Sequence, residues 1–226
     1  MIDDTPLSEL LSKVEEQFSY KELCKLSPED KATYDRLLAN FISVNGSKAS
    51  TSEKGKALED LVAHLLKISG NVFTVAKNVK TNTNEIDEVI KLNHTGKTLA
   101  NHGLLPSRLA RFLGECKNYH KNVNVGYVGK FYSLLQTTNI TTGIIFTYHG
   151  VTGKGWSNGA GLIKKMYLQR EDEEHRVAII VFNIEDFKSI ANGKNFFEII
   201  DAKLDALRYD TSVSKFISPH SAENFL

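Results

Sequence analysis

The chain has 226 residues, of which 41% are apolar and 24% charged, and its formal net charge is +1. This composition is typical of a folded globular protein and excludes a disordered tail. No stretch approaches the roughly 18 consecutive apolar residues of a transmembrane helix, and the acidic N-terminus is unlike a signal peptide, so we expect a cytoplasmic protein. Cys24 and Cys116 lie outside any CxxC pattern, which argues against a disulfide framework or a zinc site.

The near-zero net charge hides an uneven distribution along the chain. Residues 54–165 carry fifteen Lys and Arg against six Asp and Glu, a surplus of nine positive charges. Residues 1–36 and 166–226 each carry four more acidic than basic side chains. A basic middle segment could contact a polyanion such as nucleic acid, although a solvated charge pattern would look the same.

The N-terminal part is predicted to be helical. Thr5-Pro6 and Ser27-Pro28 are each an N-cap followed by a first-turn proline, and apolar residues at helical spacing follow both. The polar segment 45–55 is predicted to be a linker or loop. From Lys54, leucines and valines at helical spacing predict an amphipathic helix that ends near Ser69.

Strands and helices are then predicted to alternate. Two β-prone runs, near 71–79 and 84–92, are predicted to form neighbouring strands. The segment 93–107 is predicted to be an inserted loop. The later elements are strands near 110–117, 141–149 and 176–184, and helices near 123–138, 162–170, 184–191 and 195–208. The expected domains are an N-terminal helical region, 1–50, a core, 51–183, and C-terminal helices packed on that core, 184–226.

The glycine-rich stretch "GVTGKGWSNGAG", residues 150–161, fails the phosphate-loop pattern because Trp156 follows Gly155 and because its glycine spacing is not GxGxxG. We expect a loop near a substrate, in which Trp156 either stacks or packs. The lysines expected to contact phosphates are Lys121, Lys154, Lys164 and Lys165.

Glu115 and Lys117 are the acid-x-Lys pair that points to chemistry. The chain contains four such triplets, but the others open or lie within predicted helices, where positions i and i+2 face different ways. On a strand, the period of two places both side chains on one face, with Gly114 and Cys116 on the other.

Two further carboxylates are predicted to join them. Asp87 lies in the preceding strand, and carboxylates on adjacent strands can approach within a few ångströms, which favours a divalent cation between them. Glu59 lies on the same side of its helix as Val62 and Leu66, so we expect it at the edge of the packed stripe. Taken singly, each of these residues also fits a surface charge or an ordinary ion pair.

In this order the motifs resemble the PD-(D/E)XK nucleases, above all the Mrr-like restriction endonucleases and Holliday-junction resolvases. The similarity covers roughly residues 54–170, through "KGKALEDLVAHLLK", the aspartate strand, "ECKNYH" and "GIIFTYHGVTGKGWSNGAG". It implies an α/β, restriction-endonuclease-like core of order α-β-β-β-α-β, with a mixed central sheet flanked by helices and an N-terminal helical appendage. The family's usual proline is replaced by Ile86.

The resemblance also implies a set of roles. Asp87 and Glu115 would ligate Mg²⁺, or Mn²⁺ as a substitute, with the backbone carbonyl of Cys116. Lys117 would position the attacking water, and Glu59 would support the metal or bind a second one. Gln136, in the helix after the third strand, and His120, three residues beyond Lys117, are secondary candidates.

The implied function is a DNA endonuclease that leaves a 5′-phosphate and a 3′-hydroxyl, with a role in restriction or defence against foreign DNA. A homodimer is expected because cutting both strands takes two sites. The alternatives are a DNA-binding module that does not cut, a nuclease subunit of a larger repair or recombination complex, and an interaction scaffold with an incidental ion pair.

Overall fold

The computed structural model describes residues 19–80, 85–153, 155, 157–172 and 175–209. The helix predicted after Thr5-Pro6 lies outside these residues. Among the described residues, no helix is both long and apolar enough to cross a membrane.

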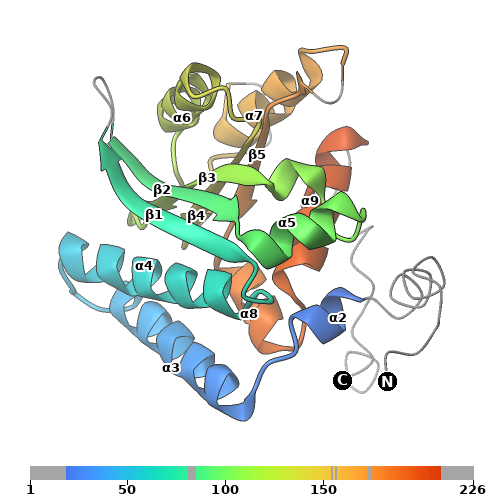
Figure 1. Cartoon of the computed structure of the whole chain (residues 1–226). Coiled ribbons are helices and arrows are strands. Elements are labelled where there is room, and N and C mark those ends of the chain that lie inside the picture. Colours follow the sequence, from blue (N-terminus) through green and yellow to red (C-terminus); the bar gives the residue numbers. More distant parts are fainter. Residues whose placement is uncertain (1–18, 81–84, 154, 156, 173–174, 210–226) are drawn as a thin grey trace, which may run out of the picture.

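A five-stranded mixed sheet forms the centre of the molecule, with its strands in chain order across the sheet (Figure 1). The first three strands are antiparallel neighbours, and the last three are parallel. The strands are β1 (Phe73–Lys80), β2 (Glu85–Leu92), β3 (Arg111–Lys117), β4 (Thr142–Thr147) and β5 (Ala178–Phe182). The predicted α/β class and restriction-endonuclease-like arrangement are therefore confirmed.

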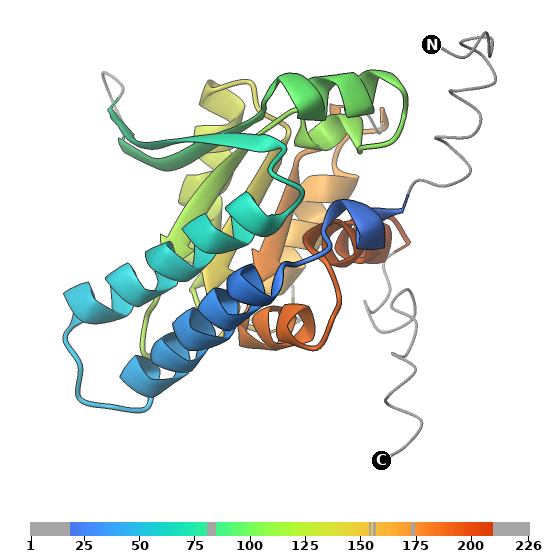
Figure 2. The same ribbon diagram turned by 60° about the horizontal axis from the view of Figure 1, so that its bottom comes forward.

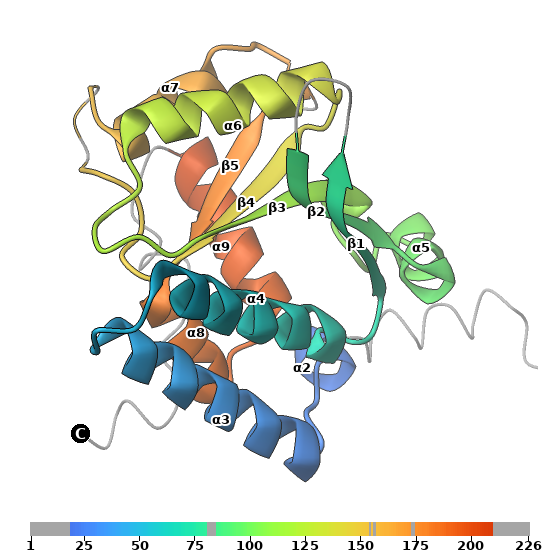
Figure 3. The same ribbon diagram turned by 90° about the vertical axis from the view of Figure 1, so that its left-hand side faces the viewer.

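Helices cover both faces of this sheet. Figure 3 shows α6 and α7 on one face and α3, α4 and α8 on the other, while α9 packs against β5. The helices are α2 (Tyr20–Leu23), α3 (Pro28–Asn45), α4 (Thr51–Ile68), α5 (His94–Asn101), α6 (Val125–Thr137), α7 (Gly159–Leu168), α8 (Ile184–Ala191) and α9 (Phe196–Arg208), with a short 3₁₀ turn at Ser107–Leu109. Below, the two faces are called the α6 face and the α4 face.

Local sequence explains where the main helices begin. Ser27 caps α3 ahead of Pro28, and Ser50 forms a capping box with Glu53 at the start of α4. Asn124 caps α6 by accepting a hydrogen bond from the amide of Tyr127. The start of α6 is therefore fixed beyond β3, near the carboxyl ends of the parallel strands β3 and β4.

The predicted loop at 93–107 is wrong in one respect, because it contains α5. Asn93 caps this helix by accepting from the amide of Gly96. A Cβ on Gly96 would lie 2.6 Å from the carbonyl oxygen of Val72, so the helix packs against the backbone before β1 through a residue without a side chain. The glycine weakened the helical signal in the sequence although it is what lets the helix dock.

The β1–β2 hairpin projects from the body of the molecule (Figure 2). Most side chains of β1 from Thr74 to Asn78 are exposed, although Phe73, at the base of the hairpin, is buried. The ring of Phe73 packs against Phe197 of α9, with 5.8 Å between the two ring centroids. The hairpin is thus anchored at its base while its outer part remains open to solvent.

The predicted domain boundaries fall between α3 and α4 and between β5 and α8. Helices on both sides of each boundary pack together, since α3 contacts both α4 and α8. The division into three parts stays a prediction.

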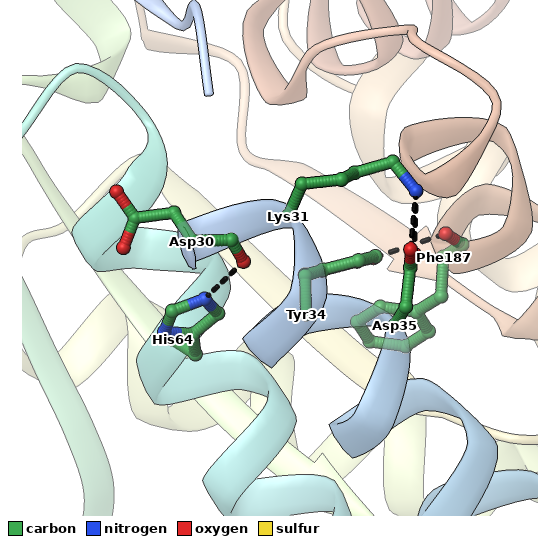
Figure 4. A network of polar contacts seen from close by, with 6 residues as sticks. All are labelled: Asp30, Lys31, Tyr34, Asp35, His64 and Phe187. Carbon is green, nitrogen blue, oxygen red and sulfur yellow. Dashed lines mark hydrogen bonds and ion pairs between the residues drawn. The ribbon is translucent and has the colours of Figure 1, made fainter. Parts of the chain in front are cut away.

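Polar contacts tie α3 to α4 and α8 (Figure 4). His64 of α4 lies with Nε2 3.1 Å from the carbonyl oxygen of Asp30, so Nε2 is the donor. The fully buried Tyr34 donates its hydroxyl hydrogen to the carbonyl oxygen of Phe187 in α8 at 3.0 Å. Lys31 and Asp35 form an ion pair at the surface of α3. The buried contact is the one that should matter for stability.

We predict that Tyr34→Phe lowers the free energy of unfolding by about 1–2 kcal/mol, because it removes one buried hydrogen bond while keeping the ring. Denaturant unfolding measures the change. Tyr119→Phe, at an exposed ring, is the matched control and should change stability by less than about 0.5 kcal/mol. Equal stabilities of Tyr34→Phe and the unaltered protein would show that the contact with Phe187 contributes nothing.

Candidate active site at the end of the third strand

β3 places Glu115 and Lys117 on the α6 face of the sheet. Glu115 stands in register with Ile145 of β4, and Lys117 with Thr147. By strand alternation, the side chain of Cys116 points to the opposite face, as would a Cβ on Gly114. The predicted separation of Glu115 and Lys117 from Cys116 therefore agrees with the register.

Asp87 meets this pair from β2. The recorded pairing of β2 with β3 runs from Lys91 opposite Arg111 to Glu88 opposite Gly114, so Asp87 follows directly where the pairing ends. The ammonium of Lys117 lies 2.7 Å from Oε1 of Glu115 and 3.2 Å from Oδ2 of Asp87. Those two carboxylate oxygens consequently lie no more than 5.9 Å apart, the sum of the two distances.

Tyr127 is a member of the site that the sequence did not reveal. Its hydroxyl donates to Oε1 of Glu115, the same oxygen that Lys117 contacts. The ammonium of Lys117 also lies 5.3 Å from the centroid of the Tyr127 ring, a cation–π distance. The cap at Asn124 was a usable signal, because it puts Tyr127 in the first turn of the helix that follows Glu115 and Lys117.

Burial shapes the electrostatics of this cluster. Glu115 is 5% exposed, and burial raises the pKa of its carboxyl group, opposed by the hydrogen bonds from Lys117 and Tyr127. Burial alone would lower the pKa of Lys117, but the hydrogen bond and charge of Glu115, with a contribution from Asp87, raise it above its usual range. The pKa of Tyr127 is raised by burial and by Glu115. Lys117 is thus held as a cation between two carboxyl groups.

A second acidic residue of β2 lies on the α4 face. Glu88 is 2% exposed, and burial raises the pKa of its carboxyl group against the influence of Lys77, whose ammonium is 3.6 Å away. Neither oxygen of Glu88 has a hydrogen-bond partner among the described residues. A Cβ on Gly114 would lie 3.0 Å from Oε2 of Glu88, so the carboxyl group occupies space that a larger residue would fill.

Glu59 is not brought to the cluster around Lys117. Contrary to the predicted place at the edge of the packed stripe, its side chain is exposed. Its charge contributes to raising the pKa values of Glu88 and Cys116, which lie on the α4 face. Glu59 belongs with that face because α4 crosses the sheet opposite α6 (Figure 3). Within the part of the chain that the structure describes, Glu59 forms no hydrogen bond or ion pair with Asp87, Glu115 or Lys117.

The secondary candidates have different surroundings. Gln136 is exposed near the end of α6 and accepts from Arg170 at 3.4 Å, roughly 13 Å along the helix from Tyr127. Nδ1 of His120 lies 3.3 Å from the ammonium of Lys54.

The lysines predicted to contact phosphates lie on different elements. Lys121 is exposed beyond β3, and Lys164 and Lys165 lie on α7. Lys154 and Trp156 fall outside the described residues.

The residues that could hold a metal ion are Asp87 and Glu115. No group of three or more His, Cys, Asp or Glu side chains within the described ranges is arranged for a metal ion. Mg²⁺ in proteins is commonly bound by one or two carboxylates together with waters and substrate phosphates, so two carboxylates are a sufficient donor set. Both already contact a single cation, Lys117. The donor chemistry therefore fits a hard divalent ion.

Comparison with known proteins places the chain in a family. Residues 51–173, more than half of the chain, match the family Mrr_cat, described as restriction endonuclease. The match begins at α4 and extends past α7, so it contains β2, β3 and α6. No curated protein matches the chain.

We predict that Gly114→Ala lowers the free energy of unfolding by about 1–3 kcal/mol, because the new methyl group would crowd Glu88 and Ile90. Gly129→Ala is the matched control, since a Cβ on this residue of α6 meets nothing within 4 Å. It should raise stability by up to about 1 kcal/mol through helix propensity. Unfolding curves in denaturant measure both, and equal effects of the two substitutions would contradict the packing of Glu88 over Gly114.

Proposed function

Since the chain belongs to the Mrr_cat restriction endonuclease family, we propose that this nuclease is a Mg²⁺-dependent DNA endonuclease whose site is Asp87, Glu115 and Lys117. The products would be a 5′-phosphate and a 3′-hydroxyl. The observation that carries the proposal is the position of Lys117, within hydrogen-bond distance of carboxylates from two neighbouring strands. A catalytic acid pair and a catalytic lysine would then lie together at the end of β3.

Asp87 and Glu115 would hold the ion, with the backbone carbonyl of Cys116 as a further oxygen donor; Mn²⁺ would substitute for Mg²⁺. When bound, the ion supplies Lewis-acid stabilisation of the phosphoryl oxygens and makes water more acidic. Glu59 is left out of this donor set, because it lies exposed with the α4 face.

The other steps fall to the side chains of this site. Lys117 would hydrogen-bond the attacking water or a phosphate oxygen, since an ammonium has three donors and its two carboxylate contacts use two of them. Tyr127 would keep the carboxylate of Glu115 oriented through its hydroxyl. The partly buried setting strengthens both interactions relative to water.

The proposal extends to assembly and biological role. Cutting both strands of a duplex takes two sites, so we propose a homodimer. A role in restriction or defence against foreign DNA is consistent with the family's description. Lys121, Lys164 and Lys165 would contact the DNA backbone, and the basic segment 54–165 contains all three.

We predict that the purified protein cuts supercoiled plasmid in the presence of Mg²⁺, and that Asp87→Ala and Lys117→Ala each remove cleavage. Gel electrophoresis of the plasmid measures the reaction, and the product ends can be tested by religation. Lys188→Ala is the matched control: this lysine also stands two residues after an aspartate, but in the helix α8. It should cut normally.

Chelation of the metal should stop the reaction of the unaltered protein, and added Mg²⁺ or Mn²⁺ should restore it. DNA binding without cleavage across metals and substrates would contradict the proposed activity and favour a non-cutting module or a subunit of a larger complex. Absence of both DNA binding and metal affinity would favour the interaction scaffold.

We also predict that Tyr127→Phe weakens Mn²⁺ binding by about 10- to 100-fold, because the carboxylate of Glu115 loses the partner that orients it. Glu115→Ala should abolish measurable binding. Calorimetric titration of Mn²⁺ is the measurement, and Tyr132→Phe on the same helix is the control. Unchanged affinity in Tyr127→Phe would mean that its hydroxyl does not orient a ligand.

A further inference from the structure

The chain immediately after Lys117 is fixed to the start of α4. Asn118, 7% exposed, donates from Nδ2 to the carbonyl oxygen of Lys54 at 2.8 Å. The side chain of Lys54 in turn reaches back to His120, with 3.3 Å between its ammonium and Nδ1 of the imidazole. None of these three side chains takes part in the cluster around Lys117. They form a second polar group at the same end of β3.

Lys54 is an unusual lysine in this protein. It is 3% exposed, yet no carboxylate among the described residues lies within ion-pair distance of its ammonium. Lys203, by contrast, is 15% exposed and pairs with Asp186 at 2.9 Å. A buried ammonium without a counter-charge is unfavourable unless a polar group accepts its hydrogen, and Nδ1 of His120 is such an acceptor.

The contact with Lys54 also fixes the imidazole of His120. A lysine ammonium has donors and no acceptor, so Nδ1 of His120 must be the acceptor. The hydrogen of the neutral ring is then on Nε2. Because His120 is exposed, this N–H donor is available to a molecule outside the protein. Lys54 thus sets both the tautomer and the orientation of an exposed donor.

His120 also lies at a distance that suits the DNA backbone. It is three residues beyond Lys117, so their Cα atoms are at most about 11 Å apart. Successive phosphates of one DNA strand advance about 3.4 Å along the duplex axis. A strand held with its cleaved phosphate at Lys117 would therefore bring a phosphate within two or three nucleotides to His120.

We propose that His120 binds a backbone phosphate of the DNA near the cleaved bond through its Nε2 hydrogen, and that Lys54 is the positioning residue that orients the ring. This inference rests on the proposed function. The contact would recognise the charge of the backbone and not the base sequence, because a phosphate is the same at every nucleotide. His120 would therefore strengthen binding equally on all duplexes and would not contribute to the choice of cleavage sequence.

The test is DNA binding by the full chain without divalent metal, so that the duplex is not cut. His120→Ala should weaken DNA binding about tenfold, because that is roughly the change in affinity when one hydrogen bond to a charged group is lost. The loss should be the same on two duplexes of unrelated sequence. Lys54→Met should weaken binding by a similar factor. The double variant should bind no more weakly than His120→Ala, because Lys54 acts through the imidazole.

Two controls match these substitutions. Lys56→Met removes an exposed lysine of the same helix that already pairs with Asp60, and His94→Ala removes an exposed histidine at the start of α5. Both should bind like the unaltered protein. Because His120 is exposed, we expect His120→Ala to fold. It therefore tests the phosphate contact even if the buried substitution Lys54→Met does not fold.

Three results would overturn the inference: unchanged affinity in His120→Ala, a loss confined to one duplex sequence, or a further loss when Lys54→Met is added to His120→Ala. Failure of the proposed function is distinguishable from these, because the unaltered protein would then leave supercoiled plasmid uncut in the presence of Mg²⁺, whatever its affinity for DNA.

Discussion

A carboxylate buried at the end of a strand must be neutralised, and the site around Glu115 is organised by that requirement. Glu115 is 5% exposed, and its Oε1 is contacted by both Lys117 and Tyr127. Each partner depends on a different local feature: Lys117 on the period of two in β3, and Tyr127 on the cap that starts α6 at Asn124. The strand and the helix therefore define the site together, and neither would do so alone.

The adjacent acids of β2 illustrate how one strand serves two faces. Asp87 turns to the α6 face and contacts Lys117, while Glu88 turns to the α4 face and pairs with Lys77. The first carboxylate is partly exposed, at the point where the pairing of β2 with β3 ends, and so can meet a substrate or an ion. The second is buried over Gly114. The strand β2 thus carries two acid–lysine pairs on opposite faces of the sheet: Asp87 with Lys117, which is partly exposed, and Glu88 with Lys77, in which the carboxylate is buried.

Much of this arrangement could be predicted from the sequence, because its local rules are strong. Strand alternation separated Glu115 from Cys116, and helical context removed the three other acid-x-Lys triplets from consideration. What was missed depended on distances between elements. Tyr127 meets Glu115 only because α6 returns over the sheet, α5 was hidden by Gly96, and Glu59 sits near enough to the packed stripe of α4 that spacing alone misassigned it. The family resemblance supplied the roles, which periodicity does not encode.

The central claim is that Asp87 and Glu115 together hold a divalent ion beside the ammonium of Lys117. Anomalous diffraction at the manganese absorption edge, from crystals grown with Mn²⁺, tests it most directly. The account predicts an anomalous peak between the carboxylates of Asp87 and Glu115. A peak beside Glu88 and Glu59 on the α4 face, or no peak between Asp87 and Glu115, would contradict it.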